Sequence, residues 1–101
     1  TELLLMDEPF ANLDAQTREI MQHELIKVWE FTRKTIVFVT HNTSEAIYLA
    51  DRVYVLTRRP GRVKDIIRVD LPRPRNLAIK RDPQFLEYDA RIWELLELGL
   101  E

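Results

Sequence analysis

Residues 3–9 read LLLMDEP and residues 35–42 read TIVFVTHN, two apolar runs that each end in polar or charged side chains. The length of the runs, and the β-branched residues of the second, are typical of buried parallel strands, which we expect over residues 1–6 and 35–40. Pro9 helps to end the first strand. The two runs therefore predict an α/β fold with a parallel sheet.

Helical patterns follow both strands. A helix is predicted over residues 14–31, with Asp14 as its N-cap, because apolar side chains recur there at the spacing of one helix face. These side chains, which we expect to be buried, are Met21, Leu25, Val28 and Trp29. Asn42, followed three residues later by Glu45, resembles a capping box and predicts a second helix to about residue 50.

The C-terminal part is expected to begin with a β-hairpin. A third strand is predicted over residues 52–57, a turn at 59–62, and an antiparallel return over 63–71. The strand–helix order before the hairpin predicts parallel strands joined by crossover helices. We place the α/β core at residues 1–71, and a connector with a C-terminal helix at residues 72–101.

The last 30 residues predict a stiff link and one helix. Residues 72–75 read PRPR, a typical extended connector. Asp82 and Pro83 are typical of a helix start, and Gly99 of a helix end. One face of this helix is apolar and is expected to be buried, together with a flanking tryptophan. It consists of Phe85, Ile92 and Leu96, flanked by Trp93.

Composition narrows the classes of protein to which the chain can belong. It has no cysteine, which excludes disulfides and thiolate metal sites, and no apolar run near the roughly 20 residues of a membrane span. Ten basic and two acidic residues lie between Arg52 and Arg81. Apolar side chains interrupt these charges at hairpin spacing and only Tyr54 is aromatic, so we expect a solvated face or a protein partner and no nucleic acid.

Polar side chains follow the two predicted strands where ligands usually bind an open α/β sheet. Asp7 and Glu8 follow the first strand and His41 follows the second. A carboxylate can hold Mg²⁺ through water, a second can activate an attacking water, and an imidazole can donate to a phosphate oxygen. The set is that of a phosphoryl-transfer site in outline. A solvated turn at residues 7–9 and a structural histidine near a helix start are the alternatives.

A zinc site formed by His23, His41 and a carboxylate is a further alternative. No short ligand spacing supports it, and we interpret His23 as a surface residue.

The order of these motifs resembles ABC transporter ATPases. Residues 3–9 resemble the Walker B motif, residues 10–14 (FANLD) the D-loop, and residues 39–42 (VTHN) the H-loop. Residues 44–46 and 49–63 continue the family pattern. The resemblance implies a partial P-loop NTPase (ABC ATPase) fold.

Roles follow from this resemblance residue by residue. It implies that Asp7 holds Mg²⁺ through water, that Glu8 is the general base, and that His41 contacts the γ-phosphate of ATP. It also implies that residues 12–14 (Asn12, Leu13 and Asp14) lie at the interface with a second ATPase subunit. The family usually has Ser where this chain has Ala11 and Asp where it has Asn42.

Other parts of the family pattern are missing. The chain has no G-x-x-x-x-G-K-[ST] loop, since its only glycines are Gly61 and Gly99, and it has no Q-loop or LSGGQ signature. We therefore expect a fragment of a longer ATPase, inactive alone. If a start codon or a stop codon lay directly upstream of Thr1 in the gene, a non-catalytic, oligomerising interaction module would be favoured instead. A third alternative is a repair-type P-loop ATPase, which DNA-stimulated hydrolysis by the intact protein would favour.

The tail resembles one group within the family. Residues 58–63, residues 69–75 and the terminal helix are similar to ATPases of nitrate, sulfonate and taurine importers. The resemblance implies a peripheral subunit on the cytoplasmic face of the cell membrane. It would bind a transmembrane permease directly and a solute-binding protein indirectly.

Overall fold

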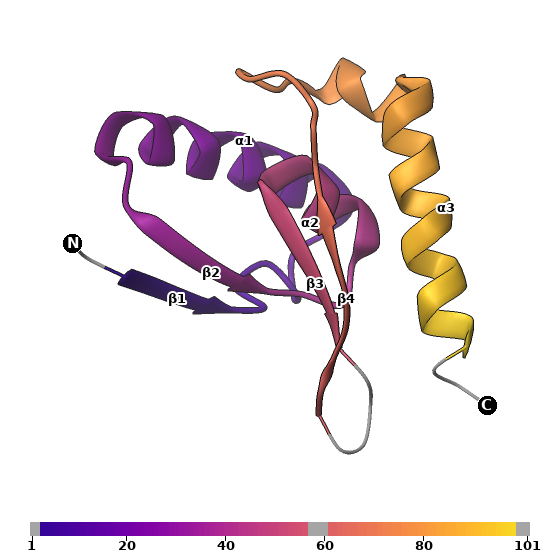
Figure 1. The fold of residues 1–101 in the computed structure, drawn as a ribbon. Coiled ribbons are helices and arrows are strands. Elements are labelled where there is room, and N and C mark those ends of the chain that lie inside the picture. The colour runs from indigo at the N-terminus through magenta and orange to yellow at the C-terminus, as the bar shows by residue number, and fades with distance from the viewer. Residues whose placement is uncertain (1–2, 57–60, 99–101) are drawn as a thin grey trace.

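The computed structural model describes residues 3–56 and 61–98, and Figure 1 shows how their elements are arranged. Their order is β1 (Leu3–Asp7), α1 (Ala15–Thr32), β2 (Thr35–Val39), α2 (Thr43–Leu49), β3 (Arg52–Leu56), β4 (Val63–Arg68), the 3-10 helix η1 (Leu77–Arg81) and α3 (Pro83–Leu98). The predicted mixed α/β architecture, with its hairpin and terminal helix, is confirmed. The 3-10 helix was not predicted, and the turn at 59–62 and the helix end at Gly99 lie partly or wholly outside the described residues.

The parallel sheet consists of β1 and β2, joined by α1 as a crossover. Their register runs from Leu3 opposite Thr35 to Asp7 opposite Val39. β3 does not extend this sheet among the described residues. It pairs antiparallel with β4 in a second two-stranded sheet, so the predicted crossover pattern stops after β2.

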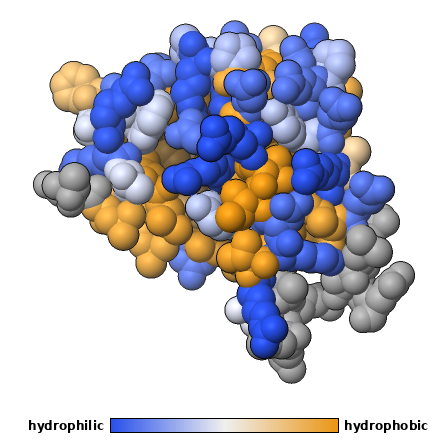
Figure 2. All heavy atoms as spheres, viewed as in Figure 1, coloured by the Kyte–Doolittle hydropathy of each residue, from blue (hydrophilic) through white to orange (hydrophobic). Residues whose placement is uncertain are grey.

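The expectation of buried strands is wrong for the parallel pair. Leu3 and Leu5 are 67% and 66% exposed, and Val37 and Val39 are also exposed. Figure 2 shows a group of apolar side chains at the lower left, where Figure 1 places β1 and β2. Parallel strands are usually covered on both faces, and the described residues do not provide two such layers here.

The hydrophobic core instead surrounds α2. Ile47 and Tyr48 have no exposed surface, and they lie among side chains from α1, the hairpin and α3. The core cluster is Ile26, Ile47, Tyr48, Val55, Ile67, Val69, Leu71, Phe85 and Ile92. The predicted apolar face of the terminal helix is confirmed, because Phe85 and Ile92 are each 3% exposed and Leu96 packs against the cluster.

The predicted buried face of α1 is wrong by about one position. Met21 and Val28 are 40% and 55% exposed, whereas Gln22 and Ile26 are buried. Trp93, also expected in the core, is 52% exposed. Apolar side chains do recur in α1 at helical spacing, but the buried face also includes the polar side chain of Gln22. Gln22 can be buried because its amide bonds Glu45 of α2, and the hydropathy of the α1 sequence gives no sign of that partner.

Local capping follows the sequence closely. The side chain of Asp14 accepts a hydrogen bond from the backbone N–H of Thr17 (2.8 Å), and that of Asp82 accepts one from Gln84 (2.8 Å). These are the expected N-caps of α1 and α3. Among the described residues, no helix combines the length and apolar character needed to cross a membrane.

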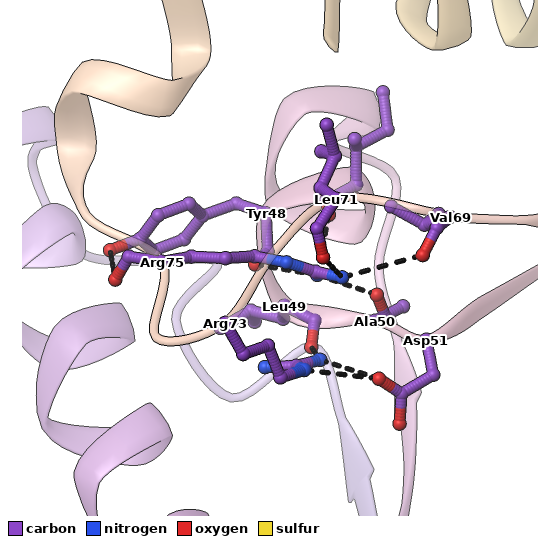
Figure 3. A network of polar contacts seen from close by, with 9 residues as sticks. Tyr48, Leu49, Ala50, Asp51, Val69, Leu71, Arg73 and Arg75 are labelled. Atoms are coloured by element: carbon purple, nitrogen blue, oxygen red, sulfur yellow. Dashed lines mark hydrogen bonds and ion pairs between the residues drawn. The ribbon is translucent and has the colours of Figure 1, made fainter. Parts of the chain in front are cut away.

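The connector after β4 is a structural anchor rather than a plain link (Figure 3). Arg75 is 2% exposed and donates to carbonyl oxygens at both the end of α2 and the exit of β4. These acceptors are Ile47 (3.2 Å), Tyr48 (3.2 Å), Ala50 (2.6 Å), Val69 (3.5 Å) and Leu71 (3.3 Å). Positive charge at a helix C-terminus is favourable, because the last carbonyls lack partners within the helix.

Candidate functional site

A cleft lies where β1 and β2 end. Parallel strands bring their carboxyl ends to one edge, so the segments that follow β1 and β2 face each other there. The cleft is lined by Glu8, Ala11, Arg18, Thr40, His41, Asn42 and Glu45.

Glu8 and His41, 33 residues apart in sequence, meet in this cleft. The carboxylate Oε1 of Glu8 contacts Nδ1 of His41. The side chain of Glu8 is 35% exposed and that of His41 is 87% exposed, so a ligand in solution could reach both groups. The expected convergence of a carboxylate and an imidazole is therefore present in the geometry.

The backbone of Glu8 is unusual, because its φ angle is +46° in a residue that is not glycine. Two backbone hydrogen bonds hold it there. Its N–H donates to the carbonyl of Val39 (2.7 Å), and its own carbonyl accepts from the N–H of Ala11 (3.2 Å). Such conformations cost energy and concentrate at functional sites, and here the turn directs the Glu8 side chain towards His41.

Asp7 is placed differently from Glu8. It is the last residue of β1, opposite Val39, and it is exposed but does not line the cleft. Asp7 still belongs to the strand, whereas Glu8 lies in the turn after it with a positive φ angle, so that only Glu8 lines the cleft. The structure thus brings together two of the three predicted residues, and the metal-binding role of Asp7 stays a prediction.

The described residues contain no group of three His, Asp or Glu side chains that could hold a metal ion together. The zinc alternative therefore gains no support. Mg²⁺ is commonly held by one or two carboxylates, with water and substrate phosphates completing its shell. The single exposed carboxylate of Asp7 fits that manner of binding.

The segment at residues 10–14 lies between the cleft and α1, and Ala11 is its member that lines the cleft. Phe10 is buried and its ring lies 5.8 Å from that of Phe38. Asn12 and Asp14 are exposed and Leu13 is half-buried. The hydrogen bonds that Asp14 accepts from Thr17 lower its pKa. The interface role of Asn12, Leu13 and Asp14 stays a prediction.

Sequence reasoning missed the buried polar side chains behind His41. Gln22 is 2% exposed and Glu45 is 4% exposed, and the Nε2 of Gln22 donates to Oε2 of Glu45 (2.7 Å). Asn42 caps α2 as predicted, through the N–H of Glu45 (3.0 Å). The reciprocal half of a capping box is absent, because the N–H of Asn42 donates to Thr40 Oγ1 (3.0 Å). The one available signal was that Arg18, Gln22 and Ile26 share a helix face.

Comparison with known proteins places this site in context. No protein-family model matches the chain. It is 55% identical over 96 residues to an uncharacterized ABC transporter ATP-binding protein of Methanocaldococcus jannaschii, covering 95% of this chain and 35% of the relative. It is 43% identical to the nitrate import ATP-binding protein of Synechocystis sp., covering 94% of this chain and 38% of the relative.

A further match is the aliphatic sulfonates import ATP-binding protein of Bacillus cereus. The identity is 39% over 97 residues, covering 96% of this chain and 38% of the relative. The matches fall in the C-terminal part of these relatives, and the chain spans a little over a third of their length.

Proposed function

We propose, from the homology of this chain to the C-terminal part of ABC transporter ATP-binding proteins, that it forms part of the ATP-hydrolysing subunit of an ABC importer. The observation that carries the proposal is the contact of Glu8 with His41 in a cleft at the ends of two parallel strands. A carboxylate and an imidazole held together there suit the activation of water and the recognition of a phosphate.

In the proposed reaction, Glu8 accepts a hydrogen bond from the attacking water and takes its proton as the bond from the water oxygen to the γ-phosphorus forms. The bond between this phosphorus and the β–γ bridging oxygen breaks at the same centre, and ADP leaves with that oxygen. His41 donates from its ring to a γ-phosphate oxygen, where negative charge must be stabilised. Mg²⁺, held by Asp7 through water, would supply charge neutralisation at the phosphates. The phosphates themselves would be held by residues outside these 101, because the sequence contains no phosphate-binding glycine loop.

The contact between Glu8 and His41 restricts this mechanism. A neutral imidazole carries hydrogen on only one ring nitrogen. If Nδ1 donates to Glu8, then Nε2 can donate to a phosphate only when the ring is protonated. In a neutral ring the hydrogen must instead lie on Nε2, and Nδ1 can then no longer donate to Glu8.

The experiment that tests the proposal is a chimera in which this chain replaces the matching C-terminal segment of the Synechocystis nitrate import protein. Glu8→Gln should lower Mg-ATP turnover by roughly 10²–10⁴-fold, the contribution of a general base, while ATP binding is retained. Glu24→Gln, an exposed position on α1, is the matched control. Unchanged turnover in Glu8→Gln, or a parent chimera that binds ATP without hydrolysing it, would refute the catalytic proposal.

The solute and the partners are further parts of the proposal. The relatives named for nitrate and aliphatic sulfonate import support nitrate or a sulfonate as the anionic solute. Taurine is proposed from the resemblance of the tail alone. The subunit would then work as a dimer on the cytoplasmic face of the membrane, against a permease fed by a solute-binding protein. Restored uptake of one of these solutes, when the chimera replaces the native subunit, is the corresponding test.

A second candidate function is a non-catalytic, oligomerising fragment. The exposed apolar side chains of β1 and β2 favour it, because a face of this kind usually has a partner. Sedimentation of the chain over a range of concentrations tests it. A monomer at all concentrations would contradict it.

A further inference from the structure

The turn that carries His41 is closed by a ring of hydrogen bonds. Thr40 Oγ1 donates to Glu45 Oε1 (2.6 Å), the N–H of Glu45 donates to Asn42 Oδ1 (3.0 Å), and the N–H of Asn42 donates to Thr40 Oγ1 (3.0 Å). His41 lies between two members of this ring, and its own side chain is almost fully exposed. Because the exposed imidazole is held by little packing, the position of His41 depends mainly on its backbone, and the ring of hydrogen bonds fixes that backbone.

Glu45 is the centre of this arrangement. It is a buried carboxylate, and one oxygen accepts from Thr40 while the other accepts from Gln22 of α1 (2.7 Å). A buried carboxylate is tolerated only when its oxygens are hydrogen-bonded, and its place in the first turn of α2 is favourable for negative charge. Glu45 thus joins the His41 turn to α1 through one hydrogen bond on each side.

The opposite wall of the cleft is attached to the same face of α1. Arg18 Nε donates to the carbonyl of Phe10 (3.2 Å), and its Nη2 donates to that of Ala11 (3.1 Å). Arg18 and Gln22 are separated by one helical turn, so they project from one side of α1. The helix thus holds residues 10–11 through Arg18 and residues 40–42 through Gln22 and Glu45.

We propose that Glu45 is the positioning residue of His41, and that Gln22 couples this position to α1 and hence to the segment at residues 10–14. This inference rests on the proposed function in one respect, which is that His41 contacts a phosphate. The positioning of His41 by Glu45 and Gln22 does not depend on any ligand. Glu45 itself does not touch the ligand.

A buried carboxylate that served only to stabilise the start of α2 would affect the whole fold and not His41 in particular. The chain offers a matched pair of substitutions that separates these roles. Thr40→Val removes the bond to Glu45, whereas Thr43→Val removes a similar bond from the same end of α2 to Asp89 of α3 (2.7 Å). Both replace a hydroxyl by a methyl group of nearly the same size.

The test is NMR of the 101-residue chain and these variants, without nucleotide. In Thr40→Val, the His41 ring resonances should lose their shift from Glu8, and the Asn42 amide should exchange about tenfold faster, because its acceptor is gone. Thr43→Val should lower the free energy of unfolding by a similar amount, but it should leave the His41 ring resonances and the exchange rate of the Asn42 amide unchanged. Equal effects of the two variants on His41, or no effect of Thr40→Val, would overturn the proposal.

Glu45 is tested directly by two further variants. Glu45→Gln should keep the His41 resonances, because the Oε1 of Gln22 is buried without a partner and can accept from the new amide after the Gln22 side chain turns over. Glu45→Ala should displace His41. Displacement of His41 in Glu45→Gln to the same extent would overturn the positioning role. These results stand apart from the chimera, since Glu8→Gln can leave hydrolysis unchanged while the ring still positions His41.

Discussion

Replacing Arg75 by Met removes the guanidinium that joins the end of α2 to the exit of β4, and it keeps most of the packing of the side-chain stem. Three of the five carbonyls that accept from Arg75 belong to residues 47, 48 and 50, at distances of 3.2, 3.2 and 2.6 Å. The other two, at 3.5 and 3.3 Å, are longer and weaker. The substitution leaves these carbonyls buried without their donor.

The magnitude follows from the three shorter contacts, which share the two hydrogens of Nη1 and therefore amount to about two full bonds. Each hydrogen bond to a charged group contributes about 1.5–3 kcal/mol, and part of that sum is offset because Met carries no charge that must be desolvated. We expect Arg75→Met to lower the free energy of unfolding by about 3 kcal/mol. Burial lowers the pKa of Arg75 to about 10. A lowered pKa means that this group makes folding more favourable with rising pH only above about 10, so the cost of the substitution should not vary between pH 6 and 9.

Urea unfolding followed by tryptophan fluorescence measures this cost. With a slope near 1.5 kcal/mol per molar urea, the midpoint should fall by about 2 M without a change of slope. Arg81→Met, at an exposed position, is the control for the lost charge and should shift the midpoint by less than about 0.4 M. An equal shift in the two variants would refute the view that Arg75 anchors the fold through the carbonyls.

Three further changes test other parts of the structure. Phe85→Ala should lower the free energy of unfolding by about 3–5 kcal/mol by opening a cavity in the core, whereas Leu86→Ala, 54% exposed, should stay within about 0.5 kcal/mol in the same titration. Asp14→Ala should destabilise α1 at neutral pH. Because the pKa of Asp14 is lowered in the fold, the difference from the unmodified chain should vanish as pH falls below 3.8, and a constant difference in acid melts would contradict the cap. Leu5→Lys should weaken the self-association that we expect of the exposed β1–β2 face, as measured by sedimentation.

Local chemistry explains why much of the fold could be predicted. The caps at Asp14, Asn42 and Asp82 were found because each side chain bonds a backbone N–H two or three residues away. The resemblance to ABC transporter ATP-binding proteins is likewise confirmed by homology over most of the chain. The predicted convergence of Asp7, Glu8 and His41 is met in the geometry only by Glu8 and His41, which follow parallel strands that end at a common edge, and the roles of all three stay predictions.

The errors about burial have one physical origin, which is that burial depends on partners that lie far away in sequence. The hydropathy of Met21 predicted a core residue, but the neighbouring Gln22 is the buried residue. The amide of Gln22 can be buried because it donates a hydrogen bond to Glu45, 23 residues away. The apolar run at residues 3–7 predicted a buried strand, but its leucines are exposed. Burial requires a covering layer of other elements, and the sequence of the strand does not encode that layer.

By itself the sequence determined the three α-helices, the strands and the N-caps, since these depend on neighbours within a few residues. Only the tertiary structure decided that Arg75 closes α2 and that Glu45 holds the His41 turn against α1. A buried charge is stable only where several donors or acceptors converge on it, and that convergence arises from packed elements rather than from adjacent residues.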